Sequence, residues 1–203
     1  GITRATFGNN RKNSGQNVKA KTLEVMSKVC GFKLVHVNAK DGINPNDENA
    51  SFELEENKFK KIRIGLFGFG RIGRNIFRIG YNDPRFEFVA ISDLGDVEAM
   101  HYLLMRDSIH GAMKDDISLK GKDLIYGNSS TRLLPGAAPG SIPWDAFDID
   151  VVIDSTGAYR TREELQKHID SGAKRVLVSK PPINDIDRIV IQGINQNEIQ
   201  AED

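Results

Sequence analysis

Residues 61–74 read Lys61-Ile62-Arg63-Ile64-Gly65-Leu66-Phe67-Gly68-Phe69-Gly70-Arg71-Ile72-Gly73-Arg74. This pattern predicts a buried strand that passes through a Gly-x-Gly-x-x-Gly turn into a helix. Gly68 permits the tight turn, Gly70 lets the backbone approach a diphosphate, and Gly73 lets the helix pack closely on its strand. The N–H groups and positive end of that helix favour an anion. The stretch therefore predicts a dinucleotide site.

The residues that follow supply the rest of the pattern. An amphipathic helix is predicted over 72–81 and a second strand over 86–91, and Asp93 comes twenty residues after Gly73. We expect Asp93 to accept hydrogen bonds from the adenosine ribose and to repel the extra phosphate of NADP. Leu94 and Gly95 supply no cation for that phosphate, so NAD rather than NADP is the expected cofactor. The alternative is a glycine-containing strand-to-helix turn without a ligand.

Composition limits the classes of protein that remain. In 203 residues, Lys plus Arg and Asp plus Glu each total 28, so no overall field draws the chain to nucleic acid or membrane. The single Cys excludes an internal disulfide and suits a reducing compartment. No apolar run approaches the length of a membrane span. We expect a soluble, cytoplasmic protein.

Charge is distributed unevenly along the chain. Residues 1–40 hold eight Lys or Arg against one acid, whereas 41–60 hold six acids against two Lys. We interpret 1–60 as a basic N-terminal appendage followed by an acidic linker, and 61–203 as the nucleotide-binding domain. Residues 1–16 are expected to lie outside the fold, as a transit peptide, a flexible tail or an expression remnant.

Strands and helices alternate from residue 61 onward. After the first two strands the pattern predicts a helix over 97–106 and short strands and turns over 112–134. Four further elements are predicted at 150–154 (strand), 161–169 (helix), 175–179 (strand) and 188–193 (strand). This alternation predicts an α/β, Rossmann-type doubly wound, mostly parallel sheet, with the ligand across the carboxyl ends of the strands.

Several motifs together resemble the phosphorylating glyceraldehyde-3-phosphate dehydrogenase family. They occur in the family's order and spacing from about residue 61 to 203, and erythrose-4-phosphate dehydrogenases are similar enough that the sequence does not separate the two. The motifs are Gly68-Phe69-Gly70-Arg71-Ile72-Gly73-Arg74, Ala90-Ile91-Ser92-Asp93, Arg106-Asp107-Ser108-Ile109-His110-Gly111, Ile142-Pro143-Trp144, Asp154-Ser155-Thr156-Gly157-Ala158-Tyr159, Gly172-Ala173-Lys174-Arg175-Val176 and Gly193-Ile194-Asn195.

The resemblance assigns roles to individual residues. It implies that the backbone amides of Arg71 and Ile72 contact the diphosphate, that Thr156 and Gly157 line the adenine side, and that Ser179 contacts the cofactor near its nicotinamide. With the glycines and Asp93, the predicted cofactor-binding set is Gly68, Gly70, Arg71, Ile72, Gly73, Asp93, Thr156, Gly157 and Ser179.

Two positions depart from the family's pattern. Phe67 stands where the family usually has Asn, and Ala137-Ala138-Pro139 stands where it usually has a basic residue beside Asp-Pro or Asn-Pro. Both changes remove polar contacts, so we expect weaker affinity for NAD than is usual in the family.

The resemblance also implies chemistry that these residues do not supply. The family attacks its aldehyde with a Cys of a Ser-x-x-Cys-Thr-Thr-Asn segment, activated by a His of a following catalytic domain, and this chain ends before such a segment is expected. Cys30 lies upstream of the nucleotide fold and has no base near it in sequence. We therefore predict no catalytic residue in the chain. His36, His101, His110 and His168 lack metal-ligand spacing, so no metal site is predicted.

Residues 2–34 contain Ser14-Gly15-Gln16-Asn17 followed by the stretch 22–34, and this segment weakly resembles the end of a repressor-like helix-turn-helix domain, with a short helix that ends at Gly. Leu23, Met26 and Val29 form one apolar face, and Gly31 is a plausible C-cap. Basic residues precede this helix, so DNA contact is one alternative, and a solvated basic tail with one docked helix is the other.

Two hypotheses about function remain. The first is the NAD-binding portion of an oxidoreductase that oxidises a phosphorylated aldehyde with hydride transfer to NAD. The full-length form would be a homo-oligomer, because the family is tetrameric. The second is a non-catalytic nucleotide-sensing or regulatory protein whose N-terminal segment binds nucleic acid or a protein partner.

Overall fold

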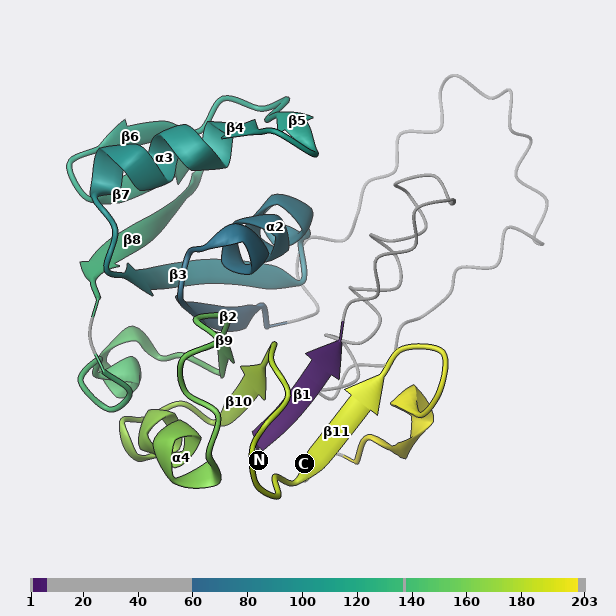
Figure 1. Cartoon of the computed structure of the whole chain (residues 1–203). Coiled ribbons are helices and arrows are strands. Elements are labelled where there is room, and N and C mark those ends of the chain that lie inside the picture. The colour runs from purple at the N-terminus through teal and green to yellow at the C-terminus, as the bar shows by residue number, and fades with distance from the viewer. Residues whose placement is uncertain (1, 7–59, 137, 201–203) are drawn as a thin grey trace.

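The computed structural model describes residues 2–6, 60–136 and 138–200 (Figure 1). Within these residues nine strands form one sheet in the order β11-β1-β10-β9-β2-β3-β8-β7-β6. Every pair from β11 to β8 is parallel, and the pairs that join β8, β7 and β6 are antiparallel. This is the α/β, mostly parallel Rossmann-type arrangement that the sequence predicts.

The first half of the sheet follows the predicted alternation. Strand β2 (Ile62–Phe67) leads into α2 (Arg71–Gly80), and β3 (Phe86–Asp93) leads into α3 (Val97–Met105). The predicted second strand is therefore two residues longer, and Asp93 is its last residue. Within the range 112–134, where short strands are predicted, the structure has β6 (Ser118–Lys120), β7 (Asp123–Tyr126) and β8 (Ser129–Pro135). Two further short strands, β4 (Arg106–Asp107) and β5 (Gly111–Ala112), pair with each other before them.

The second half holds the remaining parallel strands. A short 3-10 helix, η1 (Trp144–Phe147), precedes β9 (Val151–Asp154), and α4 (Arg162–Asp170) connects β9 to β10 (Arg175–Val178). Helix α4 begins with a capping box, in which the Thr161 side chain and that of Glu164 each accept from the other's backbone N–H. Strand β11 (Arg188–Ile191) and the 3-10 turn η2 (Gln196–Glu198) follow.

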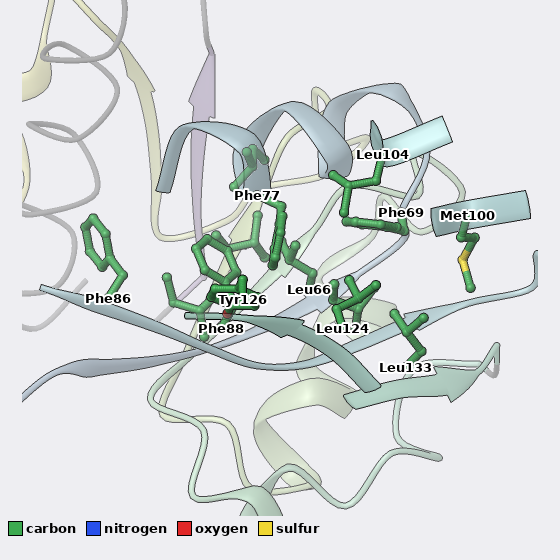
Figure 2. Close-up of a cluster of buried hydrophobic side chains, with 14 of the residues drawn as sticks. Leu66, Phe69, Phe77, Phe86, Phe88, Met100, Leu104, Leu124, Tyr126 and Leu133 are labelled. Atoms are coloured by element: carbon green, nitrogen blue, oxygen red, sulfur yellow. The ribbon is translucent and has the colours of Figure 1, made fainter. Parts of the chain in front are cut away.

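Two apolar clusters lie on opposite faces of the sheet, because side chains alternate along each strand. Ile64 and Leu66 of β2 contribute to the cluster that contains Phe77 of α2, whereas Phe67 contributes to the one that contains Trp144 and Leu165. Figure 2 shows the first cluster beneath α2 and α3. The sheet is thus covered on both faces, which leaves the carboxyl ends of its strands open for a site.

One prediction about the N-terminus is wrong. Residues 1–16 were expected to lie outside the fold, but β1 (Ile2–Thr6) is a strand of the sheet and pairs in parallel with β10 on one side and β11 on the other (Figure 1). The β-branched residues of Ile2-Thr3-Arg4-Ala5-Thr6 favour a strand, a signal that the basic composition of the segment concealed. Several predicted features lie outside the described residues. They are the helix that ends at Gly31, Cys30, His36, the linker over 41–59 and Ala137.

Candidate nucleotide-binding site

The turn after β2 has the geometry that its glycines predict. Gly68 has a φ of +93°, and a Cβ there would lie 2.7 Å from the Thr156 nitrogen. A Cβ on Gly73 would collide with the Gly68 carbonyl oxygen, so close packing of α2 requires glycine. A Cβ on Gly70 would meet no atom within 4 Å. The space next to the Gly70 Cα is therefore open to a ligand.

Helix α2 begins beside this space without a side-chain cap. Gly70 is its N-cap and provides no side chain to cap it, and the first bond within the helix runs from the Arg74 N–H to the Gly70 oxygen, at 3.0 Å. The N–H groups of Arg71, Ile72 and Gly73 precede that bond, and the first turn contains no acidic residue. A helix start of this kind attracts an anion.

Asp93 joins the end of β3 to the glycine turn. Its carboxylate accepts hydrogen bonds from the Phe69 N–H at 2.5 Å and from the Gly95 N–H at 2.8 Å. These bonds hold the turn against β3. Each carboxylate oxygen has lone-pair capacity beyond the one bond, so both remain able to accept from a ligand hydroxyl.

A cavity of about 270 Å³ lies at the carboxyl ends of β2, β3, β8 and β9. Its lining combines the glycine turn, the acid of β3 and the loop after β9. The lining residues are Phe67, Gly68, Gly70, Ser92, Asp93, Leu94, Gly136, Ser155, Thr156, Ala158 and Tyr159. None of these eleven residues is basic.

The structure places the nine predicted residues in two groups. Gly68, Gly70, Asp93 and Thr156 line the cavity itself. The other five surround it: Arg71, Ile72 and Gly73 form the first turn of α2, Gly157 follows Thr156, and Ser179 comes directly after β10.

Contacts between loops place Gly157 and Ser179 at the same edge of the sheet. The Ser179 N–H donates to the Asp154 carbonyl oxygen at 3.0 Å, and the Lys180 ammonium donates to the Gly157 carbonyl oxygen at 3.0 Å. The loops after β9 and β10 are thereby joined beside the cavity. Neither residue lines it, so contact of Ser179 with a cofactor remains a prediction.

Sequence reasoning missed an aromatic wall of the cavity. Phe67 is 2% exposed, and its ring lies 5.9 Å from that of Tyr159 and 6.5 Å from that of Trp144, measured between centroids. The sequence predicts that the ring of Phe67 replaces a polar contact beneath the nucleotide, but not that Tyr159 packs beside it. Two features of the sequence could have indicated this wall. Phe67 ends a parallel strand, where ligands bind, and Tyr159 comes two residues after Gly157.

Histidines in the described residues have structural partners. His101 on α3 lies 2.6 Å from the Ile117 carbonyl oxygen through its Nε2, and His110 lies in the turn that Asp107 organises. His168 on α4 is fully buried. Over residues 60–136 and 138–200, no group of three or more His, Cys, Asp or Glu is arranged to hold a metal ion. No helix in the described part of the chain is long and apolar enough to cross a membrane.

The parallel sheet, the glycine turn at a helix N-terminus and the acid that ends the second strand define a Rossmann-type dinucleotide-binding domain. Comparison with known proteins names the family. Residues 62–162 match the family model described as the NAD-binding domain of glyceraldehyde 3-phosphate dehydrogenase, and this part of the chain belongs to that family. The cofactor that the family model names is NAD.

Two curated relatives agree with this assignment. The chain is 36% identical over 137 residues to a glyceraldehyde-3-phosphate dehydrogenase of Geobacillus stearothermophilus, covering 68% of this chain and 41% of that protein. It is 34% identical over 140 residues to glyceraldehyde-3-phosphate dehydrogenase 1 of Bacillus subtilis (strain 168), covering 69% and 42%. The chain therefore spans about two fifths of the length of these relatives.

Proposed function

We propose that residues 61–203 bind NAD across the carboxyl ends of β2, β3 and β9. The open space above Gly70, next to the uncapped start of α2, is the observation that carries this proposal. A dinucleotide diphosphate fits there for two reasons. Glycine leaves room for its backbone, and the N–H groups of Arg71 and Ile72 are free of a cap and can donate to its oxygens.

The cavity fits the adenosine half of the cofactor. Asp93 retains acceptor capacity for the ribose hydroxyls, and Thr156 and Gly157 lie on the side where the adenine would bind. The side chains of Phe67, Leu94 and Tyr159 give the cavity a partly apolar lining, which suits a flat base. Ser179, at the end of β10, would then lie toward the nicotinamide.

The charge of the cavity favours NAD over NADP. Asp93 is the acid at its ribose end, and none of the eleven lining residues supplies a cation. A 2′-phosphate placed there would be repelled and would have no ion pair to compensate. Leu94, which is 90% exposed, borders the same position.

For the whole protein we propose the activity that its relatives' name indicates, the oxidation of a phosphorylated aldehyde. NAD supplies the hydride acceptor in that chemistry, and this chain's residues bind and orient it. The chain spans about two fifths of the length of those relatives. We place the aldehyde site in the part of the whole protein that corresponds to the rest of that length. A cytoplasmic location, a homo-oligomeric full-length form and a domain boundary near residue 60 are part of the same proposal.

Calorimetric titration of the chain with NAD and NADP tests the nucleotide proposal. The wild type is expected to bind NAD saturably and to bind NADP at least about tenfold more weakly. A tenfold difference in Kd corresponds to roughly 1.4 kcal/mol of binding free energy. Gly70→Ala places a methyl group in the open space, so we expect it to weaken NAD binding at least about tenfold. Its effect on unfolding should stay below about 1 kcal/mol, because only the N-cap preference changes.

A folded wild type that binds neither nucleotide would overturn the proposal. So would a Gly70→Ala variant that binds NAD as tightly as the wild type.

A further inference from the structure

Three buried polar side chains lie behind the cavity, on the face of the sheet that α4 covers. They are Trp144 of η1, His168 of α4 and Asp154 at the end of β9, and they lead to Thr156, an exposed residue of the loop that follows. Trp144, His168 and Asp154 are each 0% exposed. Burying an ionisable pair is costly unless the two groups satisfy each other, so the pair calls for an explanation beyond packing.

The partner of His168 on one side fixes which ring nitrogen carries its hydrogen. The Trp144 indole N–H donates to His168 Nδ1 at 3.2 Å. An indole nitrogen can only donate, so Nδ1 accepts and the ring hydrogen lies on Nε2. That Nε2 lies 3.6 Å from Asp154 Oδ2, and neither atom has a hydrogen-bond partner within the described residues.

The other oxygen of Asp154 holds the cavity wall. Asp154 Oδ1 accepts from the Thr156 N–H at 2.9 Å and from the Thr156 hydroxyl at 2.7 Å. Thr156 Oγ1 in turn accepts from the Ala158 N–H at 3.2 Å. Thr156 and Ala158 both line the cavity. The orientation of one buried carboxylate therefore sets the position of the cavity residues that follow β9.

We propose that His168 is a positioning residue for the nucleotide site. Its Nε2–H faces Asp154 Oδ2 and attracts it, so the carboxylate keeps Oδ1 toward Thr156 and the loop keeps the shape that receives the adenosine. Trp144 acts one step further back, because its donation to Nδ1 keeps the hydrogen on Nε2. The effect on ligand affinity rests on the function proposed above, whereas the effect on Thr156 does not.

The competing explanation is that His168 only fills the core. Its ring does pack against Phe67, with centroids 4.6 Å apart. A space-filling role predicts that any substitution acts through stability alone. The positioning role predicts that substitutions differ according to which ring nitrogen they imitate.

Two substitutions test the roles of the two His168 ring nitrogens separately. His168→Asn can place its amide oxygen near the Nδ1 position and accept from Trp144, but leaves no donor toward Asp154. His168→Gln can place its amide nitrogen near the Nε2 position and donate to Asp154, but gives up the acceptor for Trp144. Both variants replace the ring with a smaller amide, so each serves as the packing control for the other.

Amide hydrogen exchange of Thr156 and NAD affinity are then measured on the full chain, beside the thermal unfolding midpoint. We expect His168→Asn to speed Thr156 exchange and to raise the Kd for NAD about tenfold, because it removes the N–H that attracts Asp154 Oδ2 across 3.6 Å. His168→Gln should stay close to the wild type in both measurements, although both variants lower the unfolding midpoint.

Equal changes in the two variants, in proportion to their loss of stability, would overturn the proposal, as would unchanged Thr156 exchange in both. If the wild type fails to bind NAD, the proposed function fails and Thr156 exchange still decides the positioning role. If neither variant folds, the ring nitrogen shifts of His168 in the wild type decide: a hydrogen on Nε2 supports the proposal and a hydrogen on Nδ1 contradicts it.

Discussion

Gly70 and Gly73 stand three residues apart in the same turn, yet their surroundings differ. An added methyl group finds open space at Gly70 and collides with the Gly68 carbonyl oxygen at Gly73. We expect Gly73→Ala to lower the free energy of unfolding by about 1–3 kcal/mol, the usual cost of overpacking. Urea unfolding measures this, with Gly70→Ala as the matched control. A Gly73→Ala variant as stable as Gly70→Ala would contradict the packing shown here.

Asp107 should make stability depend on pH in the acid range. The His110 N–H, and then the Ile109 N–H and the His110 ring, hydrogen-bond its carboxylate and lower its pKa from 3.8 to about 2. A pKa lowered by folding stabilises the protein above the unfolded-state value, and the gain is lost as pH falls through the folded value.

Asp107→Asn is the reference for that effect, because its amide oxygen accepts from the same N–H groups at every pH. We expect the wild type to exceed the variant in unfolding free energy by about 1–2 kcal/mol near pH 5. The difference should shrink toward zero near pH 2. Urea unfolding of both proteins across this range measures it, and a difference that does not change with pH would refute the assignment.

At the level of single residues, sequence predicted the positions that backbone geometry demands. Gly68 and Gly73 are recognisable because only glycine fits the conformation of the one and the contacts of the other, and their spacing is local. The bond of Asp93 to the Phe69 N–H is different, because it depends on how β2 and β3 pair. The aromatic wall of Phe67 and Tyr159 likewise depends on contacts between distant residues. A pattern of residue types specifies neither.

Strands and helices from residue 61 onward were predicted well, because their apolar residues repeat with the period of each element. The alternation along β2 illustrates this: Ile64 and Leu66 join one core cluster and Phe67 joins the other. Strand β1 has five residues and pairs with β10 and β11, whose sequences lie more than 165 positions away. Pairing over such a distance leaves no local signal beyond strand propensity.

Deletion of residues 1–6 tests the role of β1 at the level of elements. In the described sheet β11 pairs with β1 and not with β10, so deletion should leave β11 without a partner. We expect the amide of Val190 to lose protection from hydrogen exchange, while those of Val152 and Ile153 in β9 keep it. Retained protection at Val190 would mean that β11 pairs with β10 once β1 is gone.

At the scale of the whole molecule, we expect nucleotide binding without aldehyde oxidation. The sequence contains one Cys, Cys30, which precedes the nucleotide-binding domain and has no neighbouring base in sequence. We expect this chain to bind NAD and to form no NADH with glyceraldehyde 3-phosphate and inorganic phosphate, as followed by absorbance. Steady NADH formation that disappears in Cys30→Ser would contradict that expectation.

An NMR titration of the isotope-labelled chain with NAD locates the bound dinucleotide residue by residue. We expect saturable shifts of the backbone amides of Gly70, Arg71 and Ile72 at the start of α2, and of Asp93 and Thr156 around the cavity. The amides of β6 and β7, at the far edge of the sheet, should stay unchanged. Shifts that avoid the start of α2, or no shifts at saturating NAD, would show that the dinucleotide does not bind where we propose.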